Sequence, residues 1–188
     1  MPHSLHPRRP DVATVEIIGG PEKLEVGLHD YDERWACAYL DHRQRILTAL
    51  TPGDVEVEHI GSTSVPGLTA KPIIDIVVTV EDITAEEDYL DGLLGCGYEL
   101  RVREPGHRLV RTPSRDAHVH IFERDDPAVA EYLLLRDHLR SDARDRALYE
   151  STKRSLLSGR WDDMNAYAEA KTEVIVAIKE RARAARRR

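Results

Sequence analysis

The pattern of apolar and polar positions divides the chain into a leading helix, a group of strands and a helical C-terminal third. Apolar residues recur at helical spacing over 29–50, and a Thr-Pro-Gly-Asp turn then ends this predicted helix, for which Asp32 is the candidate cap. The segment 55–60 alternates apolar and polar residues, as a half-buried strand does. The segment 71–80 is almost continuously apolar and β-branched, which predicts an interior strand.

Shorter elements complete the pattern. A short helix closed by glycine is expected over 84–97, with Thr84 as its cap and Glu87 three residues further on. Four more strands are expected, near 15–18 and over 98–102, 107–112 and 117–123, with a turn at 113–116.

Beyond residue 125 the pattern becomes helical. Asp126 is a typical N-cap and Pro127 suits the first helical position, so a helix is predicted from there to about Leu139. A second helix is expected from about Ser141 to a Ser-Gly pair, and a third from about Asp162. We therefore predict an α+β fold, with a mixed sheet, flanking helices and C-terminal helices that pack beside the sheet.

This order suggests three regions. They are an N-terminal extension over 1–27, an α/β core over 28–125 and C-terminal helices over 126–188, with a basic tail from about 179. The tail "KERARAARRR" either contacts phosphates or a membrane surface, or is a solvated helix end whose cations suit the helix dipole. We favour the second interpretation.

Composition narrows the class of protein. Hydrophobic residues make up 41% and charged residues 32%, as in an ordinary globular domain, and no apolar run approaches the length of a membrane helix. A net charge of −7 makes nucleic acid an unlikely general partner. Cys37 and Cys96 have no metal-ligand spacing, and the N-terminus lacks a signal peptide core, so the expected location is the cytoplasm. The oligomeric state is not predicted.

The stretch "EHIGSTSVPGLTAKPIIDIVV", residues 58–78, carries the clearest chemical signal. A glycine followed by hydroxyl residues forms a tight turn whose amides and hydroxyls make an anion site, and a lysine adds charge suited to phosphate. The candidate phosphate contacts here are Gly61, Ser62, Thr63, Ser64 and Lys71. Asp75 then stands inside an apolar strand, where a charge needs a partner or a metal. Alternatively, the turn is an ordinary loop and Asp75 pairs with an arginine.

Histidines are the next candidates. His118 and His120, in "HVHIF", lie on one face of a strand and suit a base, a phosphate contact or a ligand of Zn²⁺ or Mn²⁺. The alternative is a pair of polar residues on a solvated face. His59, Glu58 and Glu123 are further groups near in sequence, and we rank both acids below Asp75.

The C-terminal third adds cations. Arg136 and Arg140 lie four residues apart on one helical face and suit a phosphate clamp, or else an intrahelical ion-pair network. Two further pairs share the four-residue spacing, Tyr149 with Lys153 and Tyr167 with Lys171. Any exposed helix shows such spacing, so these signals are weak alone.

These segments together resemble the GrpB family, a domain also found fused to dephospho-CoA kinase. The resemblance lies in "YDERW" (31–35), the 58–78 stretch, "HVHIF" (118–122), "LLLRDHLR" (133–140), "YESTKRSL" (149–156) and "YAEAK" (167–171), and covers roughly 28–182. The resemblance implies the nucleotidyltransferase fold superfamily. That superfamily has a hydrophobic-Gly-Ser signature followed, on the next strand, by two acids separated by one apolar residue.

The resemblance also implies a mechanism and shows a departure from it. Gly61-Ser62 and Asp75 match the signature, but Val77 stands where the second acid is expected. The implied catalytic residues are Asp75, His120 and Lys71, with Arg136, Arg140 and Lys153 as further phosphate contacts. The implied metal ligands are Asp75, His118 and His120. Nucleotidyl transfer commonly uses two Mg²⁺ ions held by several carboxylates, and one aspartate suits at most one Mg²⁺ or Mn²⁺.

Three hypotheses follow. The first is an enzyme that transfers a nucleoside monophosphate from a nucleoside triphosphate (NTP) to a small acceptor. The second is a non-catalytic module that binds a nucleotide or a coenzyme A precursor and acts with a partner enzyme. The third is a purely structural protein, which requires the 61–71 loop to have no pocket beside it.

Overall fold

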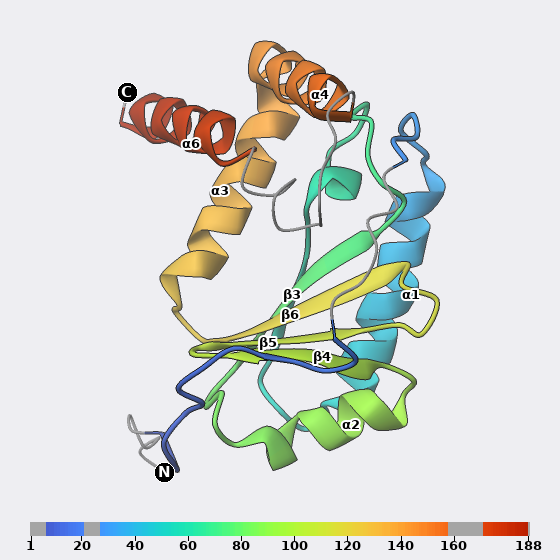
Figure 1. Cartoon of the computed structure of the whole chain (residues 1–188), viewed down its shortest axis with the longest axis vertical. Coiled ribbons are helices and arrows are strands. Elements are labelled where there is room, and N and C mark those ends of the chain that lie inside the picture. Colours follow the sequence, from blue (N-terminus) through green and yellow to red (C-terminus); the bar gives the residue numbers. More distant parts are fainter. Residues whose placement is uncertain (1–6, 21–26, 158–170, 188) are drawn as a thin grey trace.

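A six-stranded mixed sheet forms the centre of the protein in the computed structural model, which describes residues 7–20, 27–157 and 171–187 (Figure 1). The strands are β1 (Glu16–Ile17), β2 (Glu56–Ile60), β3 (Ile74–Val80), β4 (Glu99–Glu104), β5 (His107–Arg111) and β6 (Ala117–Glu123). Their order in the sheet is β1-β4-β5-β6-β3-β2, with β3 and β6 parallel and the other neighbours antiparallel. The predicted strands are thereby confirmed, and the apolar run of β3 lies inside the sheet, as expected.

The helices flank this sheet. They are α1 (Arg34–Ala49), α2 (Leu90–Gly95), α3 (Pro127–Ser141), α4 (Ala143–Leu157) and α6 (Thr172–Arg186), with short 3₁₀ turns at η1 (Ser62–Ser64) and η2 (Glu86–Asp88). The predicted cap of α3 is confirmed, because the Asp126 carboxylate accepts a hydrogen bond of 2.8 Å from the backbone N–H of Ala128. The predicted helix start near Asp162 lies outside the described residues.

Of the two other predicted caps, one differs from the structure and one is confirmed. Thr84 does not cap a helix, because its hydroxyl donates to the Asp82 carboxylate at 2.6 Å, and a 3₁₀ turn precedes α2. At α1 the Glu33 side chain makes no capping bond, and the predicted cap is confirmed, because the Asp32 carboxylate accepts a hydrogen bond of 2.9 Å from the backbone N–H of Arg34. Thr84 lies near a helix start, as predicted, but its hydroxyl bonds to the nearer Asp82.

One face of the sheet carries the main core. The inward residues of β3 and β6, such as Ile76, Val78, Val119 and Ile121, pack with Trp35 and Ile46 of α1, with Leu50 directly after it, and with Leu90 and Leu93 of α2. Alternate residues of a strand point to the same side, and those of β3 on this face, Ile74, Ile76, Val78 and Val80, are all apolar. Asp75 and Val77 consequently point to the opposite face.

The opposite face meets the start of α3. Ile60, Val77 and Phe122 are buried there against partly buried α3 residues, among them Val129, Tyr132 and Leu133. From this contact α3 rises away from the sheet toward α4 and α6 (Figure 1). The helical third therefore packs beside the sheet, as predicted.

A third cluster joins the helical third to the loop after β2. Val65 and Leu68 of the loop pack with Leu139, Tyr149 and Ile178, which come from α3, α4 and α6. These contacts cross the boundary between the predicted core over 28–125 and the predicted helices over 126–188. The division itself stays a prediction.

The basic tail takes part in ion pairs. Arg183 pairs with Glu131 of α3, and Arg181 pairs with Asp145 of α4 at 2.6 Å. These arginines thus neutralise acids of neighbouring helices. Within the described part of the chain, no helix has the length and apolar character to cross a membrane.

Candidate functional site

The Gly-Ser turn and Asp75 meet at the end of β2. Ile60 pairs in register with Asp75 of β3, and the chain turns immediately afterwards at Gly61, whose φ is +70°. A Cβ atom on Gly61 would overlap Oδ2 of Asp75 and lie 3.1 Å from its Cγ. Position 61 therefore requires glycine for two reasons: the backbone φ is positive, and the chain passes close to the Asp75 carboxylate.

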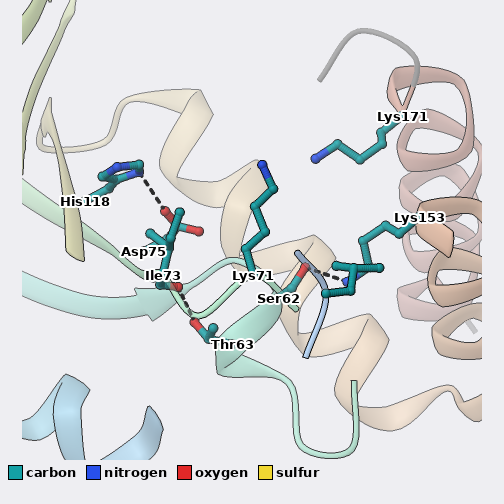
Figure 2. A pocket seen from close by; sticks show the side chains of 9 residues that line it. Ser62, Thr63, Lys71, Ile73, Asp75, His118, Lys153 and Lys171 are labelled. Carbon is teal, nitrogen blue, oxygen red and sulfur yellow. Dashed lines mark hydrogen bonds and ion pairs between the residues drawn. The ribbon is translucent and has the colours of Figure 1, made fainter. Parts of the chain in front are cut away.

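A cavity of about 170 Å³ opens beside this turn, and we call it the Asp75 pocket. Its lining residues are Leu28, Ser62, Thr63, Lys71, Ile73, Asp75, His118, Lys153 and Lys171. Figure 2 shows Lys71, Lys153 and Lys171 extending toward the pocket from three different segments, with Asp75 and His118 on its sheet side. The structure thus brings together six of the predicted site residues: Ser62, Thr63, Lys71, Asp75, His118 and Lys153.

Hydrogen bonds fix the turn. The Thr63 hydroxyl donates to the Ile73 carbonyl at 2.9 Å, and the Ser64 hydroxyl donates to the Gly61 carbonyl at 2.6 Å. Arg140 of α3 donates from Nε to the Ser64 carbonyl at 2.9 Å. Ser64 and Arg140, both predicted phosphate contacts, therefore serve the loop itself and do not line the pocket.

Lys153 is the most constrained of the three lysines. Its side chain is buried, its Nζ donates to the Ser62 hydroxyl at 3.1 Å and also to the Thr69 carbonyl, and it lies over the Tyr149 ring. Burial, together with the charge of Lys171, lowers the pKa of Lys153 to about 7. Lys153 thus positions Ser62 and links α4 to the loop.

Lys71 and Lys171 face the same space. Burial and the charge of Lys171 lower the pKa of Lys71 to about 8, while the Asp75 carboxylate acts in the opposite direction. Burial also lowers the pKa of Lys171, against the attraction of Asp75. The protein therefore gathers three like charges around one carboxylate, an arrangement that an anionic ligand would stabilise.

The histidines divide into two groups. His118 lines the pocket, with Nδ1 3.5 Å from Oδ1 of Asp75. His120 lies 4.0 Å from the same oxygen but does not line the pocket; it shares a hydrogen bond of 3.1 Å with His107 instead. Burial lowers the pKa of His120 to about 4, so its ring is neutral at neutral pH. His118, not His120, is therefore the imidazole that faces the pocket.

The remaining predicted groups lie elsewhere. His59 is on the α1 side of the sheet, stacked on Tyr39 at 4.6 Å. Glu123 accepts from the Ile83 backbone N–H at 3.1 Å, at the far end of β6. Arg136 donates to Glu58 at 2.6 Å and to the His59 carbonyl at 3.0 Å, so it binds β2 and does not line the pocket. The structure therefore does not bring the Arg136–Arg140 pair to the pocket.

The predicted metal site of Asp75, His118 and His120 stays a prediction, although both imidazoles lie within 4.0 Å of Oδ1 of Asp75. Among the described residues, the group that brings three ligand atoms within 4.8 Å of one another is His138, Asp142 and Asp145, not Asp75, His118 and His120. In that group, Asp145 is already held by Arg181 at 2.6 Å. At the Asp75 pocket the donors of the predicted set are one carboxylate and one imidazole, which suit a single cation that brings further oxygen ligands with it.

Two lining residues have little or no sequence signal. The sequence marks Lys171 only by its four-residue spacing from Tyr167, which lies outside the described residues. Leu28 is not predicted, because it follows a segment without a strong apolar period. Both are positioned by long-range packing. Leu28 is held by the pairing of the adjacent His29 with Ala70, and Lys171 by the packing of α6 on α3.

Comparisons with known proteins agree with this architecture. The family model described as GrpB protein matches residues 25–181. A UPF0157 protein of Streptomyces coelicolor is 71% identical over 187 residues, which cover 100% of each chain. A dephospho-CoA kinase of Mycolicibacterium paratuberculosis is 29% identical over 86% of this chain and 46% of its own length.

Solved structures show the same kinship. The crystal structure of conserved protein GrpB from Enterococcus faecalis matches with a TM-score of 0.73 and 31% identity, over 83% of this chain and 96% of that one. The GLD-2/RNP-8 complex matches with a TM-score of 0.52 and 17% identity, over 78% and 59% of the two chains, which shows a likeness of fold alone. The fold is shared with both structures, and the chain belongs to the GrpB family.

Proposed function

We propose that the Asp75 pocket binds the phosphates of a nucleoside triphosphate and that the protein transfers the nucleoside monophosphate to a small acceptor. The observation that carries this proposal is the convergence of three lysines and one aspartate on a Gly-Ser turn. Clustered ammonium groups beside hydroxyl and backbone N–H donors are the chemistry that recognises phosphate. The fold supports the reaction class only by likeness.

Each lining residue then has a role. Ser62, held by Lys153, presents its hydroxyl to the phosphates, and Lys71 and Lys171 neutralise their charge. His118 lies beside Asp75 and is placed to accept a proton from the acceptor group. Asp75 then orients His118 and would hold a cation that accompanies the nucleotide.

The ligands of this pocket suit one divalent cation rather than two. Asp75 would hold a single Mg²⁺ or Mn²⁺ that arrives with the nucleotide, because the remaining ligands of such an ion are phosphate oxygens and water. A bound ion would polarise the phosphate under attack. Position 77 provides no second carboxylate, since it is a valine, and its side chain is packed beneath α3.

The test is nucleotide binding followed by turnover. Calorimetry with each of the four NTPs, with Mg²⁺ or Mn²⁺ present, is expected to show binding that Lys71→Gln weakens by about tenfold, the loss expected for one charge-assisted hydrogen bond. Pyrophosphate release in the presence of candidate acceptors then reports transfer. If none of the NTPs binds under either metal, the proposal is wrong.

A second function is favoured by one observation, the apolar surroundings of Val77. Without a second metal-binding carboxylate, the same pocket would serve as a non-catalytic site for a nucleotide or a coenzyme A precursor, in the service of a partner enzyme. The similarity to a protein named dephospho-CoA kinase points to that class of ligand. Binding without pyrophosphate release, over a full panel of acceptors, would distinguish this function from transfer.

A further inference from the structure

We propose that Lys71 and Lys171 supply the positive charge that a second divalent cation provides in two-metal nucleotidyl transfer. The pocket would then bind a polyphosphate without any divalent cation and use at most one such ion during transfer. The binding part of this inference stands on the pocket alone, whereas its transfer part rests on the proposed function.

The first argument comes from position 77. Residues 75 and 77 of β3 point to one face, so this is where a second metal-binding acid would stand. Val77 is only 1% exposed and lies in an apolar cluster with Ile60 and Phe122, beneath the first turns of α3. An ion held beside Val77 would lose its hydration without gaining a ligand there, so the position does not favour a second cation.

The second argument comes from the two lysines. Lys71 precedes β3 and Lys171 precedes α6, so they enter the pocket from different segments (Figure 2). Burial lowers the pKa of both ammonium groups and the Asp75 carboxylate acts in the opposite direction, so both lie within its electrostatic reach. Two ammonium groups carry the same charge as one divalent cation and need no carboxylate cage to hold them.

Lys153 has a different task. Its hydrogen bonds to the Ser62 hydroxyl and the Thr69 carbonyl fix it between α4 and the loop. Replacing it would disturb the loop itself, and any loss of affinity would have two causes. Lys71 and Lys171 are therefore the lysines at which we test charge, with thermal melts to show that each variant is folded.

The experiment measures tripolyphosphate binding by calorimetry, in EDTA and then in Mg²⁺. The wild-type protein is expected to bind in EDTA, and Mg²⁺ is expected to change the affinity by less than about threefold. Lys71→Gln and Lys171→Gln should each weaken binding by about tenfold or more, as expected for loss of one charge-assisted contact. Lys179→Gln is the matched control, because Lys179 is also on α6 but pairs with Glu131 at 3.1 Å, and it should bind as the wild type does. Thermal melts establish that each variant is folded.

Loss of wild-type binding in EDTA would overturn the inference, as would unchanged affinity in the folded Lys171→Gln and Lys71→Gln variants. Failure of the proposed function looks different: tripolyphosphate binds through the lysines, but no NTP gives pyrophosphate. Conversely, transfer whose rate rises with the square of the free Mg²⁺ or Mn²⁺ concentration would confirm the reaction and contradict the replacement of the second cation.

Discussion

At the residue scale, Gly61 sets the distance between the loop and the Asp75 carboxylate. Gly61→Ala is expected to destabilise the protein by about 1–3 kcal/mol through its positive φ alone, and further because the new methyl overlaps that carboxylate. Tripolyphosphate affinity should fall as well, since either the loop or Asp75 must move. Urea unfolding and calorimetry measure the two effects.

The matched control for this change is Gly67→Ala in the same loop. Gly67 has a φ of +77°, but no heavy atom lies within 4 Å of the position that an added methyl group would take. This variant should show the backbone cost without loss of anion affinity. Equal losses of affinity in the two variants would mean that contact between Gly61 and Asp75 does not matter.

The buried lysines predict opposite effects of pH on binding and on stability. The pKa of Lys153 is lowered to about 7 and that of Lys71 to about 8, so both lose charge as the pH rises through 7–8. Anion affinity should then fall by up to about tenfold per pH unit for each ammonium group that binding requires. Calorimetry at pH 6.5, 7.5 and 8.5 measures this slope.

Stability without ligand should change in the other direction. From about pH 7 to 10.5 the unfolded chain holds protons on these lysines that the folded chain has released, so the free energy of unfolding contributed by them increases with pH. Lys153→Met removes one titrating group and should flatten this rise in denaturant experiments. A slope identical to that of the wild type would show that Lys153 titrates normally.

The residues of the site are only partly predictable from sequence. Gly61, Ser62 and Asp75 can be found because a tight turn, hydroxyl donors and a charge within an apolar strand are all local features. The sequence pattern assigns Arg136 to phosphate, but its guanidinium pairs with Glu58, 78 residues away along the chain. Four-residue spacing shows which residues share a helical face, but not which part of the protein that face meets.

At the element scale, the contact between β3 and α3 decides whether a second acid is tolerated. Val77→Asp places a carboxylate among Ile60, Phe122 and the apolar start of α3, which should destabilise the fold by several kcal/mol. No second metal ion should bind. Urea unfolding and Mn²⁺ titration of the folded fraction check both expectations.

Val77→Ala separates burial of charge from loss of volume. It removes two methyl groups from the same cluster and should cost about 1–3 kcal/mol, clearly less than the aspartate. If Val77→Asp is as stable as the alanine variant and binds one more Mn²⁺ than the wild type, position 77 does face a cation site.

The elements themselves are largely visible in the sequence, because their signals are local. Alternation in β2, the β-branched run of β3 and the Asp-Pro start of α3 each predict one element, and the structure confirms all three. The predicted cap at Thr84 is wrong because Asp82, two residues earlier, competes for its hydroxyl. The sheet order cannot be deduced, since β3 pairs with β6 across more than thirty residues of intervening chain.

At the scale of the whole molecule, the pocket is a joint product of the sheet and the C-terminal helices. The Gly-Ser turn follows β2, yet Arg140, Lys153 and Lys171 reach it or its pocket from the helical third. Val65 and Leu68 pack on the same helices. Unfolding of the helical third alone would therefore dismantle the pocket, and we expect the two parts to unfold together.

Ile178→Ala tests this coupling from a distance. Ile178 of α6 is fully buried against Val65 and Leu68 of the loop after β2, so its truncation should lower the free energy of unfolding by about 2–5 kcal/mol. Val176→Ala, on the same helix but 48% exposed, should change stability by less than about 0.5 kcal/mol. Calorimetric melts should show one transition that moves to lower temperature in Ile178→Ala, with weaker tripolyphosphate binding near the melt, because the loop loses its support. Two separate transitions, of which only one shifts, would instead mean that 28–125 folds independently and that the helices are an added part.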